Sequence, residues 1–205
     1  MPTLDQLIER VQKTKNGFAD IRKAAEEIVA EITPADNLTL GQALYASDVH
    51  QTRMLATFLF GYQAAASPET LQVLRDVVSR DPDWRVQEIL AQAFDHYCAD
   101  IGYETALPTI EAWITDAHFN VRRAASEGLR IWTSKPYFRD HPGVAIRLLS
   151  QLKDDDSEYV RKSAGNALRD ISRKFPDLVK AELQNWDASD KKIAQTHRLA
   201  GQFLK

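Results

Sequence analysis

The sequence contains a single cysteine, Cys98, and no apolar run that approaches the roughly 20 residues needed to cross a bilayer. One cysteine excludes an internal disulfide bond and fits a reducing cytoplasm. We interpret it as a small buried side chain, with a nucleophile as the alternative. The opening segment MPTLDQLIER carries charge too early for a signal peptide. We therefore expect a cytoplasmic protein that contacts no membrane.

The sequence also lacks the short motifs of several large enzyme classes. It has no GxxxxGK, GxGxxG or GxSxG pattern, which argues against phosphate-binding loops and nucleophile elbows. No two histidines have metal-ligand spacing among His50, His96, His118, His141 and His197. We interpret the acidic segment KDDDSE, residues 153–158, as a capping loop, with a Mg²⁺ site as the alternative. We predict neither a metal nor a cofactor.

Positive charge is scarce in the first part of the chain and gathers later. The net charge is -3, which alone argues weakly against nucleic acid. Residues 1–120 hold 9 Lys and Arg against 18 Asp and Glu, whereas residues 121–180 hold 13 against 8. Because local field rather than net charge attracts a polyanion, the basic segment indicates where such a partner would bind.

Three segments align without gaps: 81–94, 116–129 and 155–168. Each begins with Asp and has Val five residues later, and the period is 35 residues and then 39. We expect the extra residues in a loop at KPYFRDHPG, 135–143, which has two prolines and a glycine. Periods of this size with two apolar helices per unit predict an α-solenoid.

The spacing of apolar residues within the repeat predicts helices. Three, four, seven and eight residues after each Val, the positions are apolar or small, which is a helical period. The many small residues there predict close approach of helices. Partner helices are expected at 67–78, 104–115, 143–153 and 176–186, and 48–63 resembles a degenerate unit. Three tryptophans fall on or beside apolar faces and are predicted core: Trp113, Trp132 and Trp186.

The resulting architecture is all-α, a right-handed α-α superhelix of the HEAT/ARM-like solenoid kind with a concave basic groove. We predict one domain, 1–205, with an N-terminal helical cap at 1–47, repeats at 48–186 and a C-terminal basic helix at 187–205. The cap contains two helices within 4–32. We find no strand pattern, and we expect a monomer.

A polar stripe recurs on one helix face, two, six and nine residues after each repeat Val. Its members are Glu88, Gln92, Asp95, Arg123, Glu127, Arg130, Lys162, Asn166 and Arg169. In helical solenoids the second helix of each pair commonly lines the concave side. Arginine forks fit phosphate oxygens, so a phosphate backbone suits this stripe. The alternative is a solvated face with ion pairs such as Arg123 with Glu127.

These residues resemble the HEAT-like-repeat DNA alkylation repair family, the AlkC/AlkD-type alkylpurine DNA glycosylases. The likeness spans roughly residues 80–200 and is carried by three segments: DWRVQEILAQAF (83–94), VRRAASEGLR (121–130) and YVRKSAGNALRDISRKFPDLV (159–179). The first has a Trp followed four residues later by an acid, Trp84 and Glu88, where the family has a Trp and a catalytic carboxylate. The second is similar to the family's arginine helix, especially in the AlkC branch.

The resemblance implies a bacterial base-excision enzyme that binds duplex DNA and releases N3- or N7-alkylated purines. Trp84 would contact the lesion deoxyribose, and Glu88 would stabilise the developing positive charge and position water. Arg123 would grip the phosphate near the lesion. We predict DNA contacts from the stripe and its neighbours at Arg122, Arg123, Arg130, Arg161, Lys162, Asn166 and Arg169.

The sequence departs from the AlkD type at two positions. Asn166 stands where that type has a second catalytic Trp, and asparagine cannot supply the aromatic contact. Glu88 in place of an Asp is a smaller change, because the carboxylate remains, one methylene further out. Two alternatives therefore stay open: a non-catalytic DNA-binding paralogue and a protein-binding scaffold.

Overall fold

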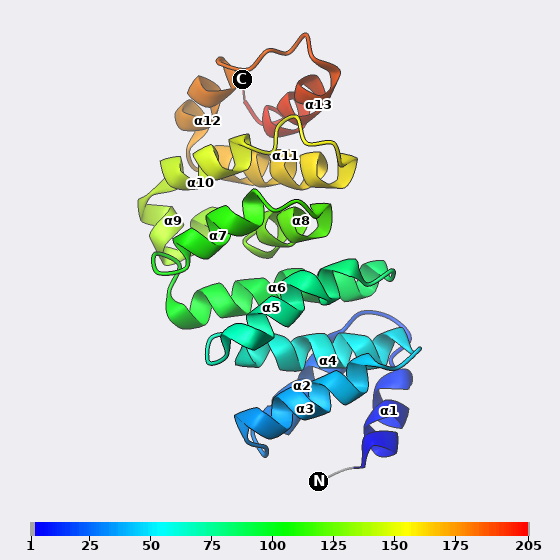
Figure 1. Cartoon of the computed structure of the whole chain (residues 1–205). Coiled ribbons are helices and arrows are strands. Elements are labelled where there is room, and N and C mark those ends of the chain that lie inside the picture. The colour runs from blue at the N-terminus through cyan, green and yellow to red at the C-terminus, as the bar shows by residue number, and fades with distance from the viewer. Residues whose placement is uncertain (1–2, 205) are drawn as a thin grey trace. The chain divides into compact units, whose positions relative to one another are not determined.

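The computed structural model describes residues 3–204, which form thirteen α-helices and two 3₁₀ helices without a strand (Figure 1). The prediction of an all-α chain is confirmed. By its internal contacts the chain divides into two compact units, Met1–Asp100 and Ile101–Lys205. The single domain of 1–205 stays a prediction. No helix within 3–204 is long and apolar enough to cross a membrane.

The first unit is built around one central helix. It contains α1 (Leu4–Gln12), α2 (Ala19–Val29), α3 (Pro34–Tyr45), α4 (His50–Gln63), α5 (Pro68–Asp76), a 3₁₀ turn (Val78–Arg80) and α6 (Trp84–Ile101). Helix α4 contacts α1, α2, α3 and α5. Because neighbours surround it, α4 is buried on most sides from Thr52 to Gly61 and lacks a clear polar face. The two predicted cap helices and the helix at 48–63 are confirmed.

The second unit consists of helix pairs in two layers (Figure 1). It contains α7 (Leu107–Ile114), α8 (Phe119–Gly128), a 3₁₀ turn (Trp132–Ser134), α9 (Pro136–Asp140), α10 (Pro142–Ser150), α11 (Glu158–Ser172), α12 (Pro176–Leu183) and α13 (Lys191–Ala200). Helices α7, α10 and α12 contact one another in turn, and α8, α11 and α13 form the other layer. The predicted partner helices are confirmed, and the core tryptophans Trp113, Trp132 and Trp186 are buried.

The loop predicted at 135–143 is wrong, because a short helix, α9, forms there. Pro136 and Pro142 are the first residues of α9 and α10, where proline's missing N–H costs nothing and its fixed φ favours the helix. Phe138 is fully buried, with its ring centre 4.8 Å from that of Trp132. The two prolines therefore begin helices, and the aromatic pair holds the extra residues against the core.

Small residues let neighbouring helices approach closely, as predicted. A Cβ added to Gly61 of α4 would lie 2.7 Å from Ala93 Cβ of α6. A Cβ added to Gly165 of α11 would lie 2.8 Å from Leu199 Cβ of α13. Both distances are shorter than real Cβ contacts, so only glycine fits at these two crossings.

The aspartate that begins each repeat builds a tight turn before the second helix. Its carboxylate accepts a hydrogen bond from the backbone N–H two residues on, a local turn that aspartate favours. The N–H donors lie 2.7–2.9 Å away in four places: Asp83 to Asp81, His118 to Asp116, Ser157 to Asp155 and Lys192 to Asp190. These aspartates therefore close the turns that lead into α6, α8, α11 and α13.

An arginine ties each of two such turns to the preceding repeat. Arg122 of α8 donates from Nε and Nη2 to both carboxylate oxygens of Asp155, at 2.6 and 2.8 Å. Its Nη1 also donates to the carbonyls of Asp116 and Ala117. Arg53 of α4 grips Asp81 in the same way, at 2.7 and 3.2 Å. The shared geometry identifies 48–63 as a true repeat helix.

We expect Arg122→Gln to destabilise the protein by about 2–3 kcal/mol, which lowers Tm by roughly 5–10 °C. The reason is that the Asp155 carboxylate, only 6% exposed, would lose its charged partner. Thermal unfolding followed by circular dichroism measures the change. Arg139→Gln is the control, because Arg139 pairs with Asp140 on the surface and its loss should leave Tm unchanged. Equal Tm values for the two variants would contradict a stabilising role for the Arg122–Asp155 pair.

Candidate nucleic-acid interface

In the first unit, α6 presents an aromatic ring and a carboxylate one helical turn apart. Trp84 is the first residue of α6 and is 63% exposed, whereas most tryptophans are largely buried. Glu88 follows four residues later and is partly exposed. Within residues 3–204, nothing donates a hydrogen bond to its carboxylate or pairs with it. The Glu88 carboxylate is therefore free of internal partners, whereas the guanidinium of Arg85 lies over the Trp84 ring, 5.7 Å from its centre.

The turn that carries Trp84 is held firmly on both sides. Arg85 donates from Nε and Nη2 to the two oxygens of Asp83, at 2.9 and 2.7 Å. These bonds lower the pKa of Asp83 to about 2. Gln87 donates to the backbone carbonyls of Val78, Ser79 and Asp81. It occupies the repeat position of Arg122, and it likewise reaches the carbonyl of its own turn aspartate.

Arg22 of α2 extends this surface and was missed by the sequence analysis. It donates a hydrogen bond to Gln92, one turn beyond Glu88 on α6. Its guanidinium lies over the rings of Phe18 and Phe58, 5.2 and 5.6 Å from their centres. No sequence signal marks Arg22, because α2 lies before the repeats and shares none of their spacing.

In the second unit, the stripe divides into free and paired side chains. Arg123 of α8 and Asn166 of α11 are partly exposed and have no hydrogen-bond or ion-pair partner among the described residues. The alternative ion pair of Arg123 with Glu127 does not form. Glu127 instead accepts from Arg130 Nη1 at 3.0 Å and from Ser163 Oγ at 2.9 Å. Arg123 therefore keeps its full hydrogen-bonding capacity.

The other Lys and Arg side chains of the stripe already have partners within the protein. Arg130 also lies 3.4 Å from Asp170. Lys162 pairs with Glu158 at 2.7 Å, but both side chains are about half exposed, so solvent weakens the pair. Arg169 donates to Gln202 at 3.3 Å and lies over the ring of Phe203. A phosphate would have to compete with these contacts.

Two of the arginines predicted to contact DNA also have structural roles. Arg122 is fully engaged by Asp155 and two carbonyls, and its side chain is 16% exposed. Arg161, at the equivalent position of α11, donates to Gln195 at 2.9 Å and to the carbonyls of Asp155 and Asp156. Because these guanidinium groups hold the helix starts in place, a phosphate would have to compete with these contacts, and the DNA contacts of Arg122 and Arg161 stay a prediction.

A further exposed aromatic was also missed. Phe119 is the first residue of α8, as Trp84 is of α6, and each lies two residues before the repeat Val. It is 40% exposed and stacks on His118, with ring centres 5.2 Å apart. Comparing the position two residues before each Val in these two aligned repeats would have found it.

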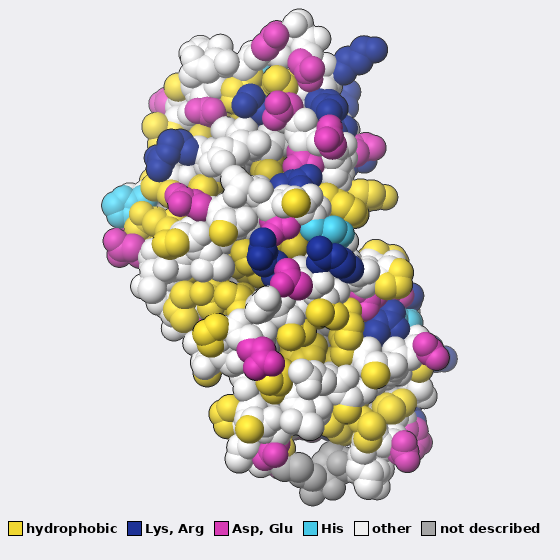
Figure 2. Space-filling model, viewed as in Figure 1, with side chains coloured by type: hydrophobic (Ala, Val, Ile, Leu, Met, Phe, Trp, Pro, Cys, Tyr) yellow, Lys and Arg dark blue, Asp and Glu magenta, His cyan; other side chains and the backbone are white. Residues whose placement is uncertain are grey.

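Charges of both signs share the surface of the second unit. On the face seen in Figure 2, Lys and Arg side chains are intermixed with Asp and Glu side chains. Within the described residues there is no group of three or more His, Cys, Asp or Glu side chains that could hold a metal ion.

Paired helices in two layers, with aspartate turns before α6, α8, α11 and α13, define a helical-repeat protein. The chain belongs to the family described as DNA alkylation repair enzyme, which matches residues 17–200. The resemblance seen in the sequence is confirmed.

Solved structures agree with this assignment. The chain is similar to AlkD2 from Streptococcus mutans, with 48% identity over 99% of this chain and 100% of that chain, at a TM-score of 0.95. It is also similar to the alkylpurine DNA glycosylase AlkC from Pseudomonas fluorescens, bound to DNA containing an abasic site analogue. That match has 25% identity and a TM-score of 0.53, and it covers 97% of this chain and 61% of AlkC. The predicted helical-repeat fold is confirmed.

A shorter match is found to the uncharacterized protein YhaZ of Bacillus subtilis (strain 168). It has 37% identity over 87 residues, which is 40% of this chain. The chain spans only 24% of the length of that relative.

The exposure of Trp84 predicts a fluorescence result. Of the four tryptophans, only Trp84 is exposed. We expect acrylamide to quench one component of the emission strongly, and Trp84→Phe to remove that component while the buried emission remains. Stern–Volmer titration of both proteins measures this. A quenchable component that survives in Trp84→Phe would contradict the arrangement of the four rings.

Proposed function

We propose that the protein binds duplex DNA and hydrolyses the N-glycosidic bond of N3- or N7-alkylated purines. Membership of the DNA alkylation repair family supports DNA as the partner. The observation that carries the catalytic part is the exposed Trp84 and the unpartnered Glu88, one turn apart on a braced helix start. The concave groove that would hold the duplex is part of the proposal.

The chemistry needs little from the protein. An alkylated purine already carries positive charge, so it leaves readily and requires little general acid. As the glycosidic bond breaks, positive charge develops on the deoxyribose. A carboxylate and the electron-rich face of an indole both stabilise that charge. Glu88 also orients the water that adds to the sugar, and the products are a free base and an abasic site.

DNA contacts in this proposal come from the side chains that the fold leaves free. Arg123 binds a backbone phosphate, because its guanidinium has no internal partner and presents a fork of donors. Asn166 adds a neutral hydrogen-bonding group on the adjacent helix, α11. Lys162 contributes after releasing its half-exposed partner Glu158. Arg130 and Arg169 contribute only in competition with Asp170, whose side chain is 15% exposed.

Asn166 favours a second candidate function. It stands where the resemblance to the AlkD type implies an aromatic contact, and its amide cannot stack on a sugar. A protein with the same DNA contacts and without base release would be a DNA-binding paralogue. The two functions differ in catalysis and share their binding surface.

Base release tests the catalytic proposal. We expect the protein to free 3-methyladenine or 7-methylguanine from methylated duplex DNA, and Glu88→Gln to slow release by about 10²–10³-fold because it removes the stabilising charge. Chromatography of the released bases measures the rates. Glu111→Gln, on exposed α7, is the control and should keep full activity.

The outcomes separate the candidates. Release that is equal in the Glu88→Gln variant would remove Glu88 from the mechanism. No release with DNA binding retained would leave the paralogue. If the unmodified protein neither releases bases nor binds DNA, the protein-binding scaffold is the remaining candidate.

Binding tests the role of Arg123. We expect Arg123→Ala to weaken duplex binding about tenfold at roughly 50 mM salt and to reduce the salt slope by about one, since one phosphate contact is lost. Fluorescence anisotropy measures both, and Tm should not change. Arg147→Ala is the control, because Arg147 is an exposed residue of α10, in the other helix layer. An equal loss for both variants would indicate nonspecific attraction rather than a placed contact.

A further inference from the structure

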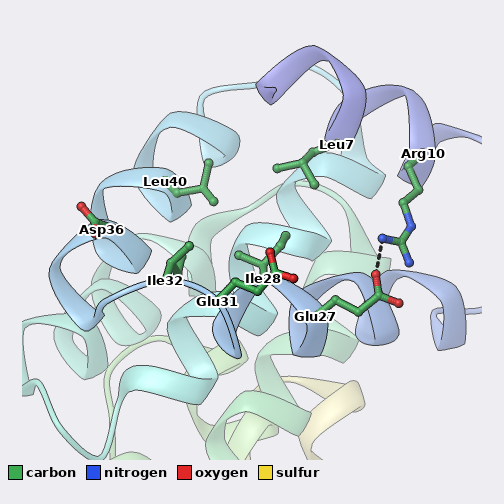
Figure 3. A pocket seen from close by; sticks show the side chains of 8 residues that line it. All are labelled: Leu7, Arg10, Glu27, Ile28, Glu31, Ile32, Asp36 and Leu40. Carbon is green, nitrogen blue, oxygen red and sulfur yellow. Dashed lines mark hydrogen bonds and ion pairs between the residues drawn. The ribbon is translucent and has the colours of Figure 1, made fainter. Parts of the chain in front are cut away.

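The first unit contains a pocket away from α6. It lies between α1, α2 and the start of α3 and has a cavity volume of about 300 Å³ (Figure 3). This is at the lower end of the size range of small-molecule sites. Four aliphatic side chains line it: Leu7, Ile28, Ile32 and Leu40. Such a wall favours a compact apolar group.

The polar lining is acidic and unevenly paired. Three carboxylates, those of Glu27, Glu31 and Asp36, face one guanidinium, that of Arg10. Arg10 is already bound to Glu27 at 2.5 Å, and this bond lowers the pKa of the Glu27 carboxyl group. Asp36 accepts a hydrogen bond from Thr33 Oγ1 at 2.6 Å and lies in the first turn of α3.

Glu31 is therefore the carboxylate left for a ligand. Within the described residues no side chain or backbone group pairs with it. Figure 3 shows its carboxylate in the middle of the pocket beside Ile28, whereas that of Asp36 lies at the edge. A negative charge beside an aliphatic wall selects a ligand that is both cationic and apolar.

We propose that this pocket binds a small apolar organic cation, an alkylammonium or arylalkylammonium. The ammonium group pairs with Glu31, and the hydrocarbon body packs against Leu7, Ile28 and Leu40. An anion of the same shape is repelled by the net negative lining. The site needs neither DNA nor the residues of α6, so it stands or fails independently of the proposed repair function.

The test uses 3-phenylpropylammonium as the probe and the ¹⁵N-labelled full chain. We expect saturable amide shifts in α1–α3 with a Kd of about 1 mM, as suits a ligand of this size. Two further compounds separate the contribution of the ligand's charge from that of its apolar body. The same-shaped anion 3-phenylpropionate should not saturate, because its charge is wrong. Ethylammonium should not saturate either, because it lacks the apolar body.

Variants locate the site. Glu31→Gln keeps the shape of the side chain and should raise the Kd at least fivefold. Glu9→Gln is the matched control, since Glu9 is an exposed acid of α1 paired with Lys13 and lies outside the pocket. Its Kd should not change. Equal Kd values for the protein and Glu31→Gln, equal binding of the anion, or no saturation by about 10 mM would each overturn the proposal.

Discussion

The fold depends on the aspartate that begins each repeat. One carboxylate performs two functions at once: it closes the turn before its own helix, and in two repeats it receives an arginine from the preceding repeat. The turn fixes where the second helix begins, and the arginine fixes that helix against its neighbour. The carboxylates of Asp81 and Asp155 are only 2% and 6% exposed, so each arginine offsets the cost of burying a charge.

This arrangement explains the adjacent arginines of α8. Successive residues on a helix point about 100° apart, so Arg122 and Arg123 face different surroundings. Arg122 points toward the start of α11, where its donors bind Asp155, so it has a structural role. Arg123 turns toward the polar stripe and keeps its donors. One arginine therefore holds the repeat in place, and the residue beside it is available to a ligand.

Much of the fold could be predicted because it follows from local spacing. The apolar period of 81–94, 116–129 and 155–168 predicts the helices and their buried faces, and the small residues predict close packing. The short helix α9 could not be predicted, since Phe138, which packs on Trp132, holds it against the core, and prolines alone are also typical of a loop. Helix α4 was hard to align because burial on most sides removes the alternation between polar and apolar faces.

The site was only partly predictable, because it depends on contacts between residues far apart in the sequence. Charge and register placed Arg122, Arg123 and Arg161 together as phosphate contacts, but which cations are free depends on acceptors more than thirty residues away. Spacing along one helix does not contain that information. Phe119 could have been found, because it repeats the position of Trp84. Arg22 could not, because its hydrogen bond to Gln92 joins helices with no common repeat.

Glu88 differs from several other acidic residues in having no partner among the described residues of its unit. Asp81, Asp83 and Asp155 each meet an arginine, and Glu127 meets both an arginine and a serine. Each of these carboxylates has a structural reason to be there. Glu88 has none within its unit, although it lies on a helix whose start is braced from both sides. Glu88 lies one helical turn from an exposed indole on a braced helix start, and the proposed catalytic role rests on that arrangement.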